Sequence, residues 1–197
     1  MNLAAWLWRA GRAHPEAPAV GVGTADVLSY GELTSRSASI ASALASRHTL
    51  APGDRVAIVA KNHPSYVEAL FGAWWGGFVA VPVNPKLHPS EVGWIVEHCE
   101  ARAVFVSPDL APVAGRLGQG TLPVFEFGSA AWSELTTGTV WREPYASSSD
   151  DLAWLFYTSG TTGRPKGAML SHGNLAAMTL GYLVDVDPTV PGDALLH

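Results

Sequence analysis

Apolar residues along the chain follow the two spacings that distinguish strands from helices. Three short runs, at 55–60, 78–83 and 101–107, are almost entirely apolar, as strands buried on both faces are. Between them, 64–75 and 89–99 show helical spacing, and each has a proline near its start. This strict alternation predicts an α/β fold: a mostly parallel sheet layered with helices on both faces, joined by right-handed crossovers.

The residues before and after this core predict further elements. Ser29 and Glu32 have the spacing of a capping box, which predicts a helix from there to about Arg47. Residues 108–150 carry weaker signals, and Pro, Ser and Asp indicate a surface loop from Gly138 to Asp151. The other expected elements are a helix at 3–13, strands at 19–22, 123–127, 152–157 and 168–172, a helix at 174–183, and a strand beginning at Ala194.

Composition and charge narrow the class of protein. The chain has 197 residues, of which 48% are hydrophobic and 15% charged, so it is not a disordered chain. A net charge of −5 argues against a general nucleic-acid binder, although one small site can still be locally positive. The single cysteine, Cys99, excludes an intrachain disulfide and a Cys-rich metal site, which fits a reducing compartment.

No segment is expected to cross a membrane, because no apolar run approaches the length of a spanning helix. The first residues lack a basic region ahead of an apolar stretch, so we do not expect them to form a signal peptide. We therefore expect a cytoplasmic protein. Trp6 and Trp8 are candidates for contact with a membrane surface, but packing of their helix on the domain is the favoured interpretation.

The segment 158–167 has the composition of a phosphate-binding loop. It combines four hydroxyl residues, three glycines, two cations and a proline, with no acidic residue. Glycines let backbone N–H groups approach oxygen atoms, hydroxyls donate without adding charge, and a lysine forms strong charge-assisted hydrogen bonds. The loop directly follows the apolar strand 152–157, which we expect to be buried, and open α/β sheets bind their ligands at such strand ends. The alternative is a plain polar connector, which seldom has this combination.

A Walker-type P-loop is the competing phosphate motif, and the spacing disfavours it. That motif has the form G-x-x-x-x-G-K-[ST], so a second glycine must stand five residues after the first, and the lysine that follows it must precede Ser or Thr. Counting five from Gly160 reaches Pro165, and Lys166 is followed by Gly167.

The stretch YTSGTTGRPKGAMLSHGNL at 157–175 resembles the phosphate-binding signature of the AMP-forming, adenylate-forming enzymes. These include acyl-CoA synthetases, aryl-acid ligases, firefly luciferase and peptide-synthetase adenylation domains. SYGEL at 29–33, the segment 53–98 and GDAL near the end also resemble the family in order and spacing. The resemblance implies that residues 1–197 form the N-terminal part of the large domain of such an enzyme.

The resemblance also implies a reaction and its participants. A carboxylate, with a fatty acid favoured, would attack ATP to give an acyl-adenylate, and the acyl group would pass to coenzyme A, with Mg²⁺ accompanying the ATP. An aryl-acid ligase, a peptide-synthetase adenylation domain and a non-catalytic nucleotide-binding remnant remain alternatives. The residues that would contact the ATP phosphates are Thr158, Ser159, Gly160, Thr161, Thr162, Gly163 and Lys166.

The resemblance implies that several residues that the family uses would lie beyond residue 197. They include the acid for Mg²⁺, the aspartate for the ribose and the lysine of a mobile C-terminal domain. We therefore expect no catalytic residue and no metal ligand within 1–197, and no turnover by these residues alone.

The other reactive residue types have simpler interpretations. No two of the seven histidines have ligand spacing on one helix, so a metal site is not expected. His172, at a strand-to-helix junction, favours a structural role, and Cys99 favours packing over nucleophilic chemistry. Core or interface packing is expected for Trp74 and Trp75, and a solvated turn for Asp150 and Asp151.

Overall fold

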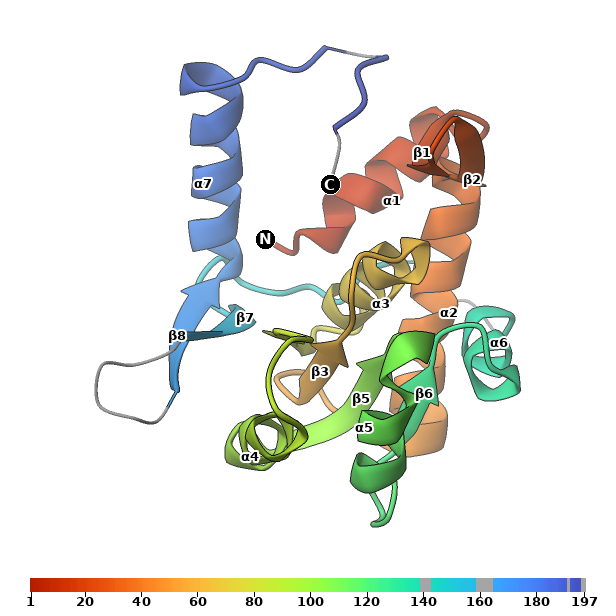
Figure 1. Cartoon of the computed structure of the whole chain (residues 1–197). Coiled ribbons are helices and arrows are strands. Elements are labelled where there is room, and N and C mark those ends of the chain that lie inside the picture. Colours follow the sequence, from red (N-terminus) through yellow and green to blue (C-terminus); the bar gives the residue numbers. More distant parts are fainter. Residues whose placement is uncertain (139–142, 159–164, 191, 196–197) are drawn as a thin grey trace.

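A computed structural model describes residues 1–138, 143–158, 165–190 and 192–195 (Figure 1). Its helices are α1 (Ala4–Ala13), α2 (Tyr30–His48), α3 (Pro64–Trp75), α4 (Pro89–His98), the 3-10 turn η1 (Pro108–Leu110), α5 (Ala111–Leu117), α6 (Ala130–Thr136) and α7 (His172–Asp185). Its strands are β1 (Pro18–Val22), β2 (Ala25–Ser29), β3 (Arg55–Val59), β4 (Val79–Val83), β5 (Ala101–Val106), β6 (Val124–Glu126), β7 (Leu152–Thr158) and β8 (Lys166–Ser171).

Six strands form one sheet in the order β6-β5-β3-β4-β7-β8. The first five run parallel, and β8 returns antiparallel to β7. Arg55 lies opposite Val79 on one side and Ala101 on the other, so the amino ends of the three central strands are aligned. This confirms the predicted α/β fold with a mostly parallel sheet.

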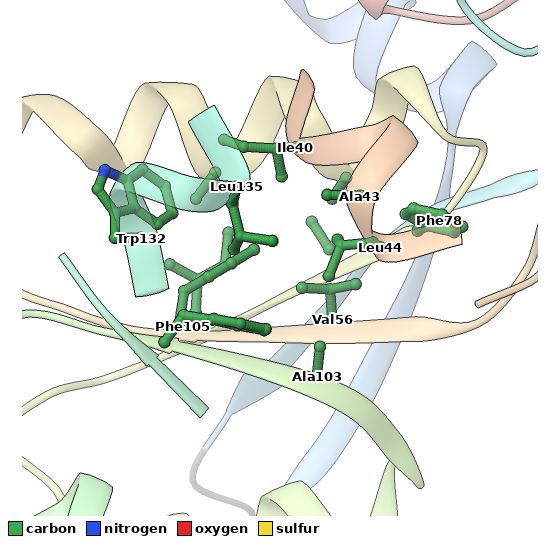
Figure 2. Close-up of a cluster of buried hydrophobic side chains, with 14 of the residues drawn as sticks. Ile40, Ala43, Leu44, Val56, Phe78, Ala103, Phe105, Trp132 and Leu135 are labelled. Atoms are coloured by element: carbon green, nitrogen blue, oxygen red, sulfur yellow. The ribbon is translucent and has the colours of Figure 1, made fainter. Parts of the chain in front are cut away.

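Alternate residues of the central strands pack on opposite faces of the sheet. On one face, Val56 and Phe105 pack under helices α2, α3 and α6. On the other, Ala57 and Val104 pack against α4 and α5. The labelled side chains of the first face are Ile40, Ala43, Leu44, Val56, Phe78, Ala103, Phe105, Trp132 and Leu135 (Figure 2). Burial on both faces explains the unbroken apolar runs of these strands.

Local signals position the two long helices of this layer. Ser29 Oγ accepts from Glu32 N and the Glu32 side chain accepts from Ser29 N, which confirms the predicted capping box. Helices α2 and α3 approach closely at Gly72, where an added Cβ would lie 2.7 Å from Ile40 Cγ2. Gly77, which ends the connection from α3 to β4, has a φ of +74°, a conformation that glycine adopts without strain.

A third apolar cluster joins the N-terminus to the first turn of α7. Leu3 and Leu7 of α1 pack with residues of α2, α3, β7 and α7. Trp6 and Trp8 are partly buried against the same cluster, as expected for a helix packed on the domain. None of the described helices has the length and hydropathy needed to cross a bilayer.

Several details differ from the sequence-based expectations. Strand β2 was not anticipated; it pairs antiparallel with β1, with Val22 opposite Ala25 across a tight turn at Gly23. Helices α5 and α6 were not anticipated either. The expected strand from Ala194 is absent in the described residues 192–195, and 196–197 lie outside them.

The expected surface loop is confirmed at Gly138 and 143–151, where residues are mostly exposed, and 139–142 lie outside the described residues.

The expectation that the candidate phosphate loop follows a buried strand is wrong. In β7 only Ala153 is buried, and Phe156 is 48% exposed. The reason is that β7 pairs with β4 at one position, Ala80 with Trp154, and its other neighbour β8 lies at the edge of the described sheet. Met169 on that edge strand is 69% exposed.

Candidate functional site

The candidate phosphate loop connects the two strands of a hairpin. Strands β7 and β8 pair antiparallel along their length, from Leu152 opposite Ser171 to Thr158 opposite Lys166. The pairing holds the two ends of the loop next to each other. Figure 1 shows the hairpin at one side of the sheet, with α7 rising from its base.

Thr158 and Lys166 are the two predicted binding residues that the structure describes. Both are exposed, and they form the last pair of the hairpin on either side of the loop. Lys166 forms no ion pair with any described acidic residue. The other predicted residues, Ser159, Gly160, Thr161, Thr162 and Gly163, lie outside the described residues.

The strand boundaries make the loop shorter than expected. Thr158 ends β7, and Lys166 and Gly167 already belong to β8, which was expected to begin at 168. Antiparallel pairing therefore extends to both ends of the motif. A lysine in a paired strand has a fixed backbone, so only its side chain adjusts to a ligand.

A cluster of three aromatic rings, those of Tyr157, His98 and Trp94, lies next to the start of the loop. The Tyr157 hydroxyl lies 2.7 Å from Nδ1 of His98, near the end of α4. The His98 ring stacks on Trp94 with centroids 4.5 Å apart, and Tyr157 meets both rings edge-on. Sequence inspection missed this group, because Tyr157 and His98 are 59 residues apart and only the packing of α4 against the hairpin brings them together.

His172 has the structural role that the sequence favoured. Its side chain is 1% exposed, and Nδ1 accepts a hydrogen bond of 3.3 Å from Leu3 N. Burial lowers the pKa of His172 to about 4, with a further decrease from the positively charged N-terminus, while Asp151 raises it. The ring is therefore neutral at pH 7 and can accept this bond. His172 is the first residue of α7, which begins two residues earlier than expected.

Packing also accounts for the tryptophans and the cysteine. Trp74 is 6% exposed and donates from Nε1 to Ala153 O at 2.9 Å, and Trp75 is 1% exposed. Cys99 is buried at the end of α4, and burial raises its pKa to about 11. A thiol with such a pKa is a poor nucleophile at neutral pH.

The described residues contain no group of three His, Cys, Asp or Glu side chains that could hold a metal ion. Asp150 and Asp151 are exposed and belong to a turn, in which Asp151 Oδ2 accepts from Ser148 N at 2.8 Å. These two carboxylates are therefore a solvated turn, as expected.

A surface hollow of about 730 Å³ lies elsewhere, between α2, α4 and α5 at the amino ends of β5 and β6. Arg47, Arg102 and Arg116 are among its lining residues. None of the described residues of the candidate loop borders it, so it is not part of the candidate site.

Comparisons with known proteins agree with this architecture. The model of the family described as AMP-binding enzyme matches residues 7–197. A feruloyl-CoA synthase from Amycolatopsis sp is 37% identical over 191 residues, which cover 94% of this chain and 36% of that protein. The chain therefore belongs to the AMP-binding enzyme family.

Solved structures show the same fold. A benzoate CoA ligase from Burkholderia xenovorans LB400 superposes with a TM-score of 0.82 at 26% identity, covering 94% of this chain and 37% of that one. ATP-bound MatB from Rhodopseudomonas palustris gives a TM-score of 0.77 at 29% identity, covering 93% of this chain and 37% of that one. The chain thus spans little more than a third of the length of these relatives.

Proposed function

We propose that this chain is the N-terminal part of the large domain of an AMP-forming acid–thiol ligase, and that it supplies the loop that binds the phosphates of ATP. The observation that carries the proposal is the acid-free loop of hydroxyls and glycines between Thr158 and Lys166, whose two ends the hairpin holds together. Membership of the AMP-binding enzyme family supports it.

The proposed chemistry proceeds in two steps. A carboxylate oxygen attacks the α-phosphorus of ATP, the bond to the bridging oxygen of the β-phosphate breaks, and pyrophosphate leaves. The thiol of coenzyme A then attacks the acyl carbon of the adenylate, loses its proton, and AMP leaves. Charge develops on the departing pyrophosphate, so a cation and several N–H and O–H donors held around it stabilise the first transition state.

The residues of the loop suit this task. Lys166 would neutralise the terminal phosphates with an ammonium group that no described acid occupies. Thr158, Ser159, Thr161 and Thr162 would donate from hydroxyls, and Gly160 and Gly163 would allow the backbone to approach. Mg²⁺ would add charge neutralisation, and its ligands are expected outside this chain.

Nucleotide exchange in the full-length protein tests the proposal. Lys166→Ala and Thr161→Ala should each weaken the use of ATP by about 1–3 kcal/mol, from lost charge-assisted hydrogen bonds, in an ATP–pyrophosphate exchange assay. Arg9→Ala, which removes a cation from the exposed face of α1, is the matched control and should leave exchange unchanged. Unchanged kinetics in both loop variants would remove the assignment.

The acid substrate has two candidates. A fatty acid remains the leading sequence-based expectation. An aryl acid is favoured by the names of the feruloyl-CoA synthase and the benzoate CoA ligase that resemble this chain. Exchange measured with ferulate, benzoate and a series of fatty acids would choose between them. Binding of ATP without exchange for any acid would instead indicate a non-catalytic remnant.

The chain of residues 1–197 by itself is expected to be inactive. It spans 36% of the length of the feruloyl-CoA synthase, and the proposed residues contact only the phosphates of ATP. Robust pyrophosphate exchange by these residues alone would show that the acid and the adenosine are also bound here.

A further inference from the structure

The end of the hairpin next to the candidate loop has little support from the sheet. Strand β7 pairs with β4 only at Trp154, four residues before Thr158. Phe156 is half exposed, and Met169 on the neighbouring strand is more exposed still. Contacts other than those of the parallel sheet are therefore needed to hold Thr158 and Lys166 in place.

Tyr157 makes such contacts on one side of the hairpin. Its hydroxyl lies 2.7 Å from His98 Nδ1, and its ring meets the rings of Trp94 and His98 edge-on at 6.3 and 5.8 Å. His98 is itself held flat on Trp94, at 4.5 Å and an interplanar angle of 26°. The hydroxyl thus meets an acceptor whose ring plane is already fixed by stacking on α4.

Gly167 closes the other side of the Tyr157 ring. The two residues are opposite each other in the β7–β8 pairing. A Cβ at position 167 would lie 3.3 Å from Cζ of Tyr157, closer than ordinary van der Waals contact. The absence of a side chain at Gly167 therefore lets the ring lie against the backbone of β8, between that strand and α4.

We propose that Tyr157 and His98 are positioning residues that hold Thr158 and Lys166, the two described ends of the candidate ATP-phosphate loop, in a fixed position relative to the parallel sheet. This inference rests on the proposed function of the loop. Tyr157 directly precedes Thr158, and Gly167 directly follows Lys166, so this pair lies in the hairpin, one residue beyond each end of the loop. The tyrosine and histidine act on ATP only through the backbone that carries these ends.

The hydrogen bond is compatible with neutral pH. Burial raises the pKa of Tyr157 above its ordinary value, so the phenol keeps its proton. The hydroxyl donates to Nδ1 when the proton of His98 is on Nε2. A small displacement of a binding group is costly when several donors must reach one ligand, so loss of this tie should affect the binding of ATP selectively.

Steady-state kinetics of the full-length protein test the inference. Tyr157→Phe keeps the ring and removes the hydroxyl, and His98→Phe keeps stacking on Trp94 and removes the acceptor. Each should raise KM for ATP by about threefold to tenfold, the value of one lost hydrogen bond, while kcat and KM for the acid stay within about twofold. The KM for ATP of the double variant should be no higher than that of the more impaired single variant, because both substitutions remove the same bond.

Two further variants separate positioning from general structure. His98→Asn places an amide oxygen near the position of Nδ1 and should restore KM for ATP toward the wild-type value, whether or not His98→Phe folds. Tyr182→Phe, an exposed tyrosine on α7, is the matched control and should change nothing. An unchanged KM for ATP in Tyr157→Phe overturns the inference. So does a change of KM for both substrates together with a lowered Tm.

Lys166→Ala in the same assay separates the two proposals. If Lys166→Ala raises KM for ATP and Tyr157→Phe does not, the positioning role fails while the function of the loop stands. If Lys166→Ala has no effect, the proposed function itself fails.

Discussion

The buried His172 should make the stability of this protein depend on pH in a defined direction. Folding lowers its pKa from 6.5 to about 4, mainly because the ring is buried and also because the N-terminal ammonium group is near. An unfolded chain therefore binds a proton at a higher pH than the folded chain does. The contribution to stability is complete above pH 6.5 and is lost as the pH falls toward 4.

The size of the effect follows from the two pKa values. A shift from 6.5 to about 4 corresponds to about 3 kcal/mol once the pH is below both values, and to about 2 kcal/mol at pH 5. Protonation also removes the acceptor for Leu3 N, because Nδ1 would then carry a proton of its own. The N-terminus and α7 should loosen together.

The assay is the free energy of unfolding in urea, measured from pH 8 to pH 5 for the wild type and His172→Asn. The asparagine oxygen can accept from Leu3 N and does not titrate. The variant will be less stable at pH 8, but between pH 7.5 and pH 5 the wild type should lose about 2 kcal/mol more than the variant does. His14→Asn, at an exposed histidine, is the control and should follow the wild type. Parallel curves for His172→Asn and the wild type would refute the reasoning.

Two further pairs of substitutions test the burial of the aromatic core and the ion pair of a buried carboxylate. Phe105→Ala should lower the free energy of unfolding by about 3–5 kcal/mol, because its fully buried ring packs edge-on against Trp132 at 5.4 Å. Phe156→Ala, at a half-exposed site, should cost less than about 1 kcal/mol, and equal losses would contradict the assigned burial. Arg36→Met should cost about 3–5 kcal/mol, because it leaves the carboxylate of Glu68, only 2% exposed, without its ion-pair partner. Glu68→Gln in the Arg36→Met background should recover part of that loss, and no recovery would show that the charge is not the cause.

The sequence by itself determined the layered sheet and the chemical character of the loop. The runs at 56–59, 79–83 and 103–106 are apolar at consecutive positions because both faces of those strands are buried, and that pattern is local. The capping box at Ser29 and the prolines that begin α3 and α4 act within one turn of a helix. Signals of this kind can be interpreted without knowing what lies across space.

The burial of the hairpin that carries the loop could not be predicted from the sequence. Its strands are apolar, which suggested burial, yet β7 meets the parallel sheet at one residue pair and β8 is exposed. The short hairpin of β1 and β2 was missed because its turn at Gly23 is a single weak signal. Exposure depends on which elements pack on a strand, and composition does not carry that information.

Only the tertiary structure brought Tyr157 to His98 and Leu3 to His172, across 59 and 169 residues of sequence. In each pair a histidine side chain forms a hydrogen bond with a residue of a distant segment, Tyr157 for His98 and Leu3 for His172. The bonding range of a hydroxyl or an imidazole nitrogen is about 3 Å, so these contacts exist only after the helices have packed. The sequence therefore determined what the loop is made of, and the packing of α4 and of the N-terminus determined which partners Tyr157 and His172 have.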